Sequence, residues 1–206
     1  MFCFTLMVAL CSIATNTWAD TGILLAAEWG NLKEVDRLLA GGADVNVRGN
    51  DGYTPLHYAI RSGQKDVAEL LIAKGADVNA RDDDGFTPLL FAIERGIVVE
   101  LLIAKGADVN AGNKDGGTPL HYAVSRNRID IIELLIAKGA NVNARNEGGV
   151  TPLHIAARAK KEVAELLIAK GANVNAPDKD ERTPLNYAID NKREAVAEVL
   201  RQHGGK

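Results

Sequence analysis

The chain has 206 residues and a mass of 22.0 kDa, which suits one ordinary domain or one elongated array of small units. Hydrophobic residues make up 47% of it and charged residues 25%, a composition that is typical of a folded protein and argues against disorder. With 24 basic and 27 acidic residues, the chain has no excess of positive charge. Binding to nucleic acid or to an anionic membrane surface depends on such an excess, so neither is expected as a partner.

Residues 1–19 differ from the rest of the chain. They carry no charged side chain, and an apolar stretch over residues 2–14 is followed by a short polar section that ends in Ala19. This pattern predicts a secretory signal peptide cleaved after Ala19, so that a mature chain beginning at Asp20 acts outside the cytoplasm, in the periplasm or as a secreted protein. An uncleaved anchor is the weaker interpretation because spanning a bilayer takes roughly 20 apolar residues. A wrongly assigned start is a further alternative.

The only two cysteines, Cys3 and Cys11, lie within this segment. Residues 20–206 therefore offer no disulfide, no thiolate metal site and no cysteine nucleophile. A lipoprotein would need a small residue before Cys11, and Leu10 stands there.

A repeat with a period of about 33 residues fills the rest of the chain. Thr-Pro-Leu begins at Thr54, Thr87, Thr118, Thr151 and Thr183. The block Glu-Leu-Leu-Ile-Ala-Lys-Gly-Ala recurs unchanged at 69–76, 100–107, 133–140 and 165–172. This spacing predicts one domain of six units, at about 20–49, 50–82, 83–113, 114–146, 147–178 and 179–206.

Each unit predicts two helices and a turn-rich connection. In the second unit, Thr54-Pro55 starts a helix because threonine is a good N-cap and proline is favoured at the first helical position. An apolar stripe follows, Gly63 interrupts it, and a second amphipathic helix begins near Asp66. Gly75 ends that helix, at a position that favours left-handed backbone. One unit cannot bury two apolar helix faces alone, so the units are expected to stack into an all-α solenoid with short hairpin connections.

The motif Thr-Pro-Leu-His at 54–57, 118–121 and 151–154, with Gly-Ala-Asp-Val-Asn at 42–46, 75–79 and 106–110, resembles the ankyrin repeat family. The resemblance covers residues 20–206. It implies L-shaped repeats in which hairpin tips and inner helices form a concave face that binds other proteins. It also implies that His57, His121 and His154 hydrogen-bond at the helix start and to the next hairpin.

Departures from the pattern indicate irregular repeats. The first repeat lacks Pro and His after Thr21 and the last has Asn186 in place of His, as expected of end caps with polar outer faces. The third repeat has Leu90 in place of His and lacks two residues near Gly96, which predicts that it makes the least regular interface. The fifth repeat lacks one residue near Ala159.

No pattern indicates catalysis or a cofactor. The three histidines lie one per repeat, too far apart to share a metal ion at the 8–10 Å spacing of packed helices. The recurrent asparagines are expected to form hydrogen bonds with nearby backbone groups. The acidic run 82–84 is interpreted as a solvated hairpin tip, because no glutamate follows it at the spacing that a calcium-binding loop requires. We found no nucleophile with a base and no phosphate-binding loop, so the chain is predicted to be a non-enzymatic protein without catalytic residues, cofactor, metal or nucleotide.

Positions that vary between repeats are free to determine the choice of partner. Aromatic and arginine side chains are common interface anchors, and they fall with several charged residues on one predicted face. The predicted protein-binding residues are Tyr53, Arg61, Asp83, Asp84, Phe86, Arg95, Lys114, Arg126, Val150, Arg158 and Arg182. The alternative is that Tyr53 and Phe86 pack on their own hairpins and the arginines form a solvated rim.

The predicted function is protein binding that regulates or protects a partner in the same compartment. The alternative is a secreted effector that binds a host protein, and a purely structural spacer is a third class. No nucleic acid, and no membrane insertion after signal cleavage, is expected. A monomer is the default for a stack of local contacts.

Overall fold

The computed structural model describes residues 20–206, so the predicted signal peptide, its cleavage and both cysteines lie outside the described residues. The chain divides between Ala107 and Asp108 into two compact units, which we call unit 1 (residues 20–107) and unit 2 (Asp108–Lys206).

Both units consist of helices joined by turns and loops. Unit 1 holds a helical stretch at 20–28 and then α2 (Leu32–Ala40), α3 (Pro55–Arg61), α4 (Lys65–Ala73), α5 (Pro88–Arg95) and α6 (Val99–Ala104). Unit 2 holds α7 (Pro119–Ser125), α8 (Ile129–Ala137), α9 (Pro152–Ala156), α10 (Lys161–Ala169), α11 (Pro184–Asp190) and α12 (Glu194–Gln202). No strand occurs in residues 20–206, and the predicted all-α class is confirmed.

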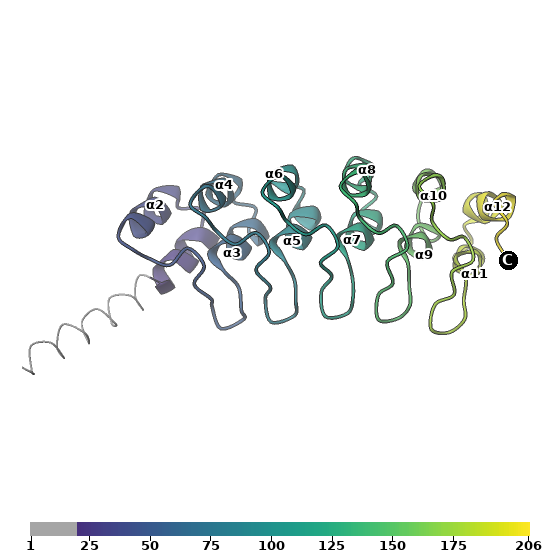
Figure 1. The fold of residues 1–206 in the computed structure, drawn as a ribbon, viewed down its shortest axis with the longest axis horizontal. Coiled ribbons are helices and arrows are strands. Elements are labelled where there is room, and N and C mark those ends of the chain that lie inside the picture. The colour runs from purple at the N-terminus through teal and green to yellow at the C-terminus, as the bar shows by residue number, and fades with distance from the viewer. Residues whose placement is uncertain (1–19) are drawn as a thin grey trace, which may run out of the picture. The chain divides into compact units, whose positions relative to one another are not determined.

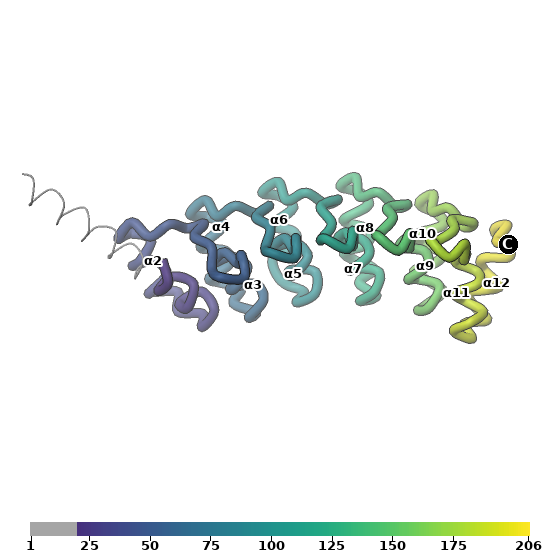
Figure 2. The backbone as a smooth tube through the Cα atoms, turned by 90° about the horizontal axis from the view of Figure 1, so that it is seen from below, coloured from purple at the N-terminus to yellow at the C-terminus, as the bar shows by residue number. Residues whose placement is uncertain are grey.

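The helices of each unit form two rows. In unit 1, α3 packs on α4 and α5, and in unit 2, α9 packs on α7, α10 and α11. The helices that begin with Thr-Pro lie next to the long loops and form the inner row (Figure 1). Figure 2 shows the same alternation from the side on which the loops lie.

The inner helices begin where the sequence predicts. Thr54 N-caps α3, Pro55 is its first residue, and the Thr54 hydroxyl and backbone N–H both engage His57 in a capping box. Thr118, Thr151 and Thr183 cap α7, α9 and α11 in the same way. Glycines with φ between +83° and +92° follow the second helices, as predicted, at Gly42, Gly75, Gly106, Gly139, Gly171 and Gly204.

The core lies between the two helix rows of each unit. Its fully buried side chains include Leu56, Ile60, Leu71, Leu89, Ile93 and Leu102 in unit 1, and Leu120, Ile131, Ile132 and Leu135 in unit 2. Burial of each such side chain contributes about 1.5–3 kcal/mol. These residues are the apolar stripes of the sequence, so the stacking of repeats follows from their spacing.

The shortened turns are absorbed in two different ways. In unit 1, α6 has six residues where α4 has nine, and its N-cap Val98 has a left-handed φ of 49°. In unit 2, α9 has five residues, and the chain enters α10 through Lys160 in an extended conformation. A left-handed conformation costs a β-branched residue more than an extended one, so Val98 is the more strained position.

The first helix pair adds exposed apolar side chains to the expected polar cap. Leu25 and Leu32 are each 41% exposed and Trp29 is 73% exposed, so this end of unit 1 presents apolar side chains. At the other end of the chain α12 is polar outside, and Arg201 there pairs with Glu194 at 2.7 Å. The outer helix α2 also exposes Lys33, Asp36 and Arg37, so the expected polar outer face is present in the first repeat but carries exposed apolar side chains beside it.

Candidate protein-binding surface

Within residues 20–206, five hairpin-shaped loops precede the inner helices that begin with Thr-Pro, and each is closed by a backbone hydrogen bond. Examples are the N–H of Asp82 donating to the carbonyl of Phe86 at 3.0 Å and the N–H of Asn146 donating to the carbonyl of Val150 at 3.1 Å. In the last four of these loops the first residue of the pair also accepts one or two backbone N–H groups with its side chain, as Asp82 does from Asp84 and Phe86. The first loop has Gly49 at that position, and there Asp51 accepts the N–H of Tyr53 instead. The loops are therefore fixed by their own sequence and present their tips in a defined register.

The three histidines fasten each inner helix to the following loop. Nδ1 of His57 accepts from the N–H of Thr54 at 3.1 Å, and its Nε2 donates to the carbonyl of Phe86 at 3.2 Å. His121 bonds the carbonyl of Val150 in the same way, and His154 bonds that of Arg182. Burial lowers the pKa of His57 to about 4 and lowers the pKa of the other two histidines as well. The structural role implied by the resemblance is confirmed.

The recurrent asparagines bridge neighbouring repeats through backbone groups. Nδ2 of Asn110 donates to the carbonyl of Gly139 at 3.0 Å, and its Oδ1 accepts from the N–H of Asn141 at 2.8 Å. Asn143 and Asn175 make both bonds with the following repeat. Oδ1 of Asn46 accepts the N–H of Asp77, and Nδ2 of Asn79 donates to the carbonyl of Gly106. The predicted role of these side chains as partners of the backbone is confirmed.

In unit 1 an aromatic group lies where the first two loops meet the inner helices. The Tyr53 ring stacks on His57 at 5.7 Å between centroids and meets Phe91 edge-on at 5.6 Å. The Arg61 guanidinium lies 5.2 Å from the Tyr53 ring centroid, and Phe86 stacks on Phe91 at 5.3 Å. We call Tyr53, His57, Tyr58, Arg61, Phe86 and Phe91 the Tyr53 cluster. Tyr53 and Phe86 are half-buried in it and Arg61 is exposed.

The remaining predicted residues of unit 1 lie near this cluster in sequence. Asp83 and Asp84 are exposed at the loop tip, and Arg95 is exposed at the end of α5. Asp82 is only 7% exposed, and its carboxylate organises the loop instead of facing water. The idea of a solvated tip therefore applies to Asp83 and Asp84 and is wrong for Asp82.

In unit 2 two predicted arginines meet on one tyrosine. The guanidinium groups of Arg158 and Arg182 lie 4.8 and 4.7 Å from the Tyr187 ring centroid. The Tyr187 hydroxyl donates to Asp178 at 2.7 Å, and burial together with this bond raises the pKa of Tyr187. Burial would raise the pKa of Asp178, but the bonds it accepts from Tyr187 and Arg182 lower that pKa overall.

Three further predicted residues lie on unit 2. Lys114 and Arg126 are exposed and Val150 is half-buried. The prediction missed Tyr58, Phe91 and Tyr187, which are the rings that hold the predicted arginines and aromatics together. The sequence did carry a signal for them. The fourth residue after the N-cap threonine is aromatic in four of the five Thr-Pro repeats, at Tyr58, Phe91, Tyr122 and Tyr187.

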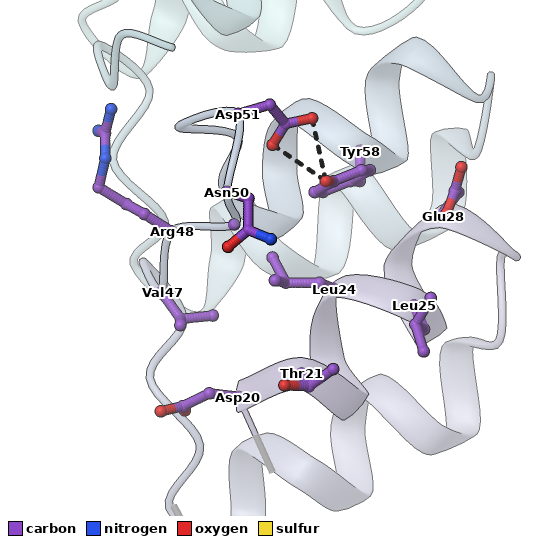
Figure 3. Close-up of a pocket in the computed structure, with 11 residues that line it drawn as sticks. Asp20, Thr21, Leu24, Leu25, Glu28, Val47, Arg48, Asn50, Asp51 and Tyr58 are labelled. Carbon is purple, nitrogen blue, oxygen red and sulfur yellow. Dashed lines mark hydrogen bonds between the residues drawn. The ribbon is translucent and has the colours of Figure 1, made fainter. Parts of the chain in front are cut away.

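A groove of about 540 Å³ opens in unit 1 between the helical stretch at 20–28 and the first loop (Figure 3). Leu24 and Tyr58 lie at its centre, and the Tyr58 hydroxyl donates to Asp51 at 3.0 Å. Burial and the bond to Asp51 raise the pKa of Tyr58 to about 12. Its lining mixes acidic side chains, such as Asp20 and Glu28, with leucines.

Within residues 20–206, no group of three or more His, Cys, Asp or Glu side chains is placed to hold a metal ion. No helix in this same range is both long enough and apolar enough to cross a membrane.

Stacked helix pairs with hairpin loops between them define a helical repeat protein whose regular surface is built for contact with other molecules. A family model described as ankyrin repeats (3 copies) matches residues 3–82, 78–146 and 145–206, and the chain belongs to the ankyrin repeat family. Ankyrin repeats are protein–protein interaction modules and generally non-enzymatic binding scaffolds. The first match begins inside the segment predicted to be a signal peptide.

Among solved structures, the chain is similar to an ankyrin repeat domain from Acinetobacter baumannii AYE, whose crystal structure was determined at 1.00 Å resolution. The two are 32% identical with a TM-score of 0.81, and the match covers 89% of this chain and 98% of that one. No curated protein matches the chain.

Proposed function

We propose that this protein binds a protein partner outside the cytoplasm through its hairpin loops and inner helices, and thereby regulates or protects that partner. The observation that carries the proposal is the Tyr53 cluster, in which exposed Arg61 lies over half-buried Tyr53 at the loop surface. Arginine and tyrosine are, with tryptophan, the side chains most enriched among those that dominate binding energy at protein interfaces.

The cluster is organised before any partner arrives. Tyr53 is held by ring contacts on several sides, and its backbone N–H donates to Asp51 at 3.2 Å. A side chain that is already fixed loses little conformational freedom on binding, so more of its contact energy appears as affinity. This arrangement favours an interaction surface over a solvated rim.

Export of the chain is supported by the sequence of residues 1–19, which is apolar and free of charged side chains. The mass of the protein purified from its source cells through a C-terminal tag tests it. A mass that lacks residues 1–19 is the expected result. A mass that includes Met1 would contradict cleavage.

The partner is sought by capture with the same tagged protein from the extracytoplasmic and cytoplasmic fractions of the source cells. The affinity of the captured partner is then measured for Arg61→Ala/Arg95→Ala, which truncates exposed side chains on α3 and α5. The control is Lys33→Ala/Lys105→Ala, which removes the same charge from exposed positions on the outer row.

We expect the arginine variant to lose at least about tenfold in affinity, or ~1.4 kcal/mol, and the lysine control to change less than about twofold. Equal effects of the two variants would place the binding site elsewhere on the molecule. Failure of every fraction to yield a partner would contradict the binding function in this cell.

A further inference from the structure

We propose that a pocket at Gly117 in unit 2 receives one aromatic side chain from the protein partner. The inference rests on the proposed function and specifies the chemistry that the partner must present. Gly117 lies at the end of the third loop, beside α7, and we call the hollow around it the Gly117 pocket. Its volume is about 270 Å³, below the roughly 300–1,000 Å³ of pockets that hold drug-sized ligands, so it suits a single side chain.

The Gly117 pocket corresponds to the space that Tyr53 fills in unit 1. The four side chains that contact the Tyr53 ring are His57, Tyr58, Arg61 and Phe91. The residues that line the pocket include His121, Tyr122, Ser125 and Ile155. Each of these lies 64 residues after its counterpart, and Gly117 lies 64 residues after Tyr53. The surroundings of an aromatic ring are thus repeated in unit 2 without the ring.

Two truncations relative to unit 1 open this space. Glycine replaces the tyrosine that would fill it, and Ser125 replaces the arginine that would cover it. Hydrogen bonds hold the walls of the pocket in place. His121 bonds Thr118 and the carbonyl of Val150. Asn113 accepts the Gly117 N–H at 2.8 Å and donates to the Tyr122 hydroxyl at 3.4 Å. The pocket is therefore an open hollow that is formed before a partner binds.

The walls select an aromatic occupant by shape and by charge. In unit 1 the equivalent walls hold a ring with centroid separations of 5.4–5.7 Å, within the range that aromatic pairs prefer. Ile155 replaces a ring on one side and offers an apolar wall to the face or edge of the occupant. Asp115 lies at the rim and disfavours an acidic side chain. A phenylalanine or tyrosine of the partner meets these requirements.

Filling the pocket from within the chain provides the critical variant. Gly117 has no left-handed φ, and a Cβ there would lie 3.1 Å from both Asn113 Oδ1 and Tyr122 Cε2, so small adjustments admit a side chain. Tyr53, Phe86, Val150 and Arg182 occupy this position in the other repeats. Gly117→Tyr is therefore expected to fold and to occupy the pocket. Gly148→Tyr is the matched control, since a Cβ at Gly148 meets only ordinary contacts at a loop tip.

The probe is N-acetyl-L-tyrosinamide, titrated into the purified isotope-labelled protein while the methyl resonances of Ile155 are followed by NMR. For the wild type we expect saturable shifts with a Kd on the order of 1 mM, and at least tenfold weaker binding of N-acetyl-L-alaninamide. The Gly117→Tyr variant should show no saturable shift with N-acetyl-L-tyrosinamide, and the Gly148→Tyr variant should behave like the wild type. Equal responses to the two amides, an unchanged response in Gly117→Tyr, or no saturation in the wild type would overturn the proposal. Circular dichroism checks that each variant folds. If the tyrosine side chain prevents folding, Gly117→Val takes the place of Gly117→Tyr.

Partner capture separates this inference from the proposed function. We expect a partner that binds the wild type and Gly148→Tyr to lose at least tenfold in affinity for Gly117→Tyr. A partner that binds all three equally would overturn the inference and leave the proposed function standing. Absence of any partner would contradict the proposed function, and the amide titration would then still decide whether the pocket accepts an aromatic ring.

Discussion

At the scale of single residues, the third residue after each N-cap threonine decides whether that threonine is satisfied. His57 accepts the backbone N–H of Thr54 and contacts its hydroxyl at 3.0 Å. Leu90 stands at this position beside Thr87 and offers no polar atom. The Thr87 hydroxyl is buried and has no hydrogen-bond partner in the described part of the chain. A buried hydroxyl without a partner carries an uncompensated desolvation cost.

Thr87→Val should therefore cost little or nothing, because it removes a hydroxyl that makes no bond. We expect the free energy of unfolding to stay within about 0.5 kcal/mol of the wild type or to rise. Thr54→Val is the matched comparison and should lose about 1–2 kcal/mol, since it breaks a capping box. Urea denaturation followed by circular dichroism measures both. Equal losses in the two variants would show that the Thr87 hydroxyl has a stabilising role after all.

The sequence predicted residue roles well where they repeat and poorly where they do not. The hydrogen bonds of His57 and Asn110 follow from the repeat pattern, because the same backbone geometry recurs from one repeat to the next. The sequence left open whether Tyr53 packs on its hairpin or anchors a partner, and the structure shows it half-buried beneath an exposed arginine. The emptiness at Gly117 was not predictable from one position, because it depends on side chains from α7, α9 and two loops.

At the scale of elements, deletions in the repeat are visible in helix length. The sequence predicted that the third repeat, which lacks two residues near Gly96, makes the least regular interface, and α6 in that repeat has only six residues. It did not predict which residue would absorb the change. The answer depends on local backbone geometry, since Val98 turns left-handed whereas Lys160, at the other deletion, stays extended.

We expect the amides of α6 to exchange with solvent faster than those of α4 and α10. A left-handed non-glycine residue costs about 1–2 kcal/mol, which corresponds to a factor of roughly 5–30 in a local opening equilibrium. Hydrogen exchange with mass spectrometry on peptides that cover 65–73, 98–105 and 161–170 measures the difference. Uniform protection of the three helices would contradict the strain assigned to Val98.

At the scale of the whole molecule, the buried histidines make stability depend on pH. Burial lowers the pKa of His57 to about 4, and it lowers the pKa of His121 and His154 in the same direction. In the unfolded chain a histidine titrates near about 6.5. Between these two pKa values the unfolded chain binds more protons than the folded one, so acid favours unfolding in this window. Protonated His57 would also direct a hydrogen from Nδ1 toward the N–H of Thr54.

The free energy of unfolding should therefore be greatest above pH 6.5 and fall as the pH is lowered toward 4. For His57 alone the loss between pH 6.5 and pH 5 is about 1.6 kcal/mol, and the other two histidines add to it. Urea titrations at several pH values in this range measure the loss, before most carboxylates are protonated.

His57→Asn provides the control for this prediction, because Asn186 accepts the N–H of Thr183 at the same position of the last repeat. The variant is expected to be less stable than the wild type at pH 7.5, since it loses the bond to the Phe86 carbonyl. Its stability should nevertheless fall by about 1.6 kcal/mol less than that of the wild type between pH 6.5 and pH 5. An unchanged pH dependence in this variant would mean that His57 is protonated in the folded protein as readily as in the unfolded chain. The bonds from Nδ1 and Nε2 would then have to be assigned differently.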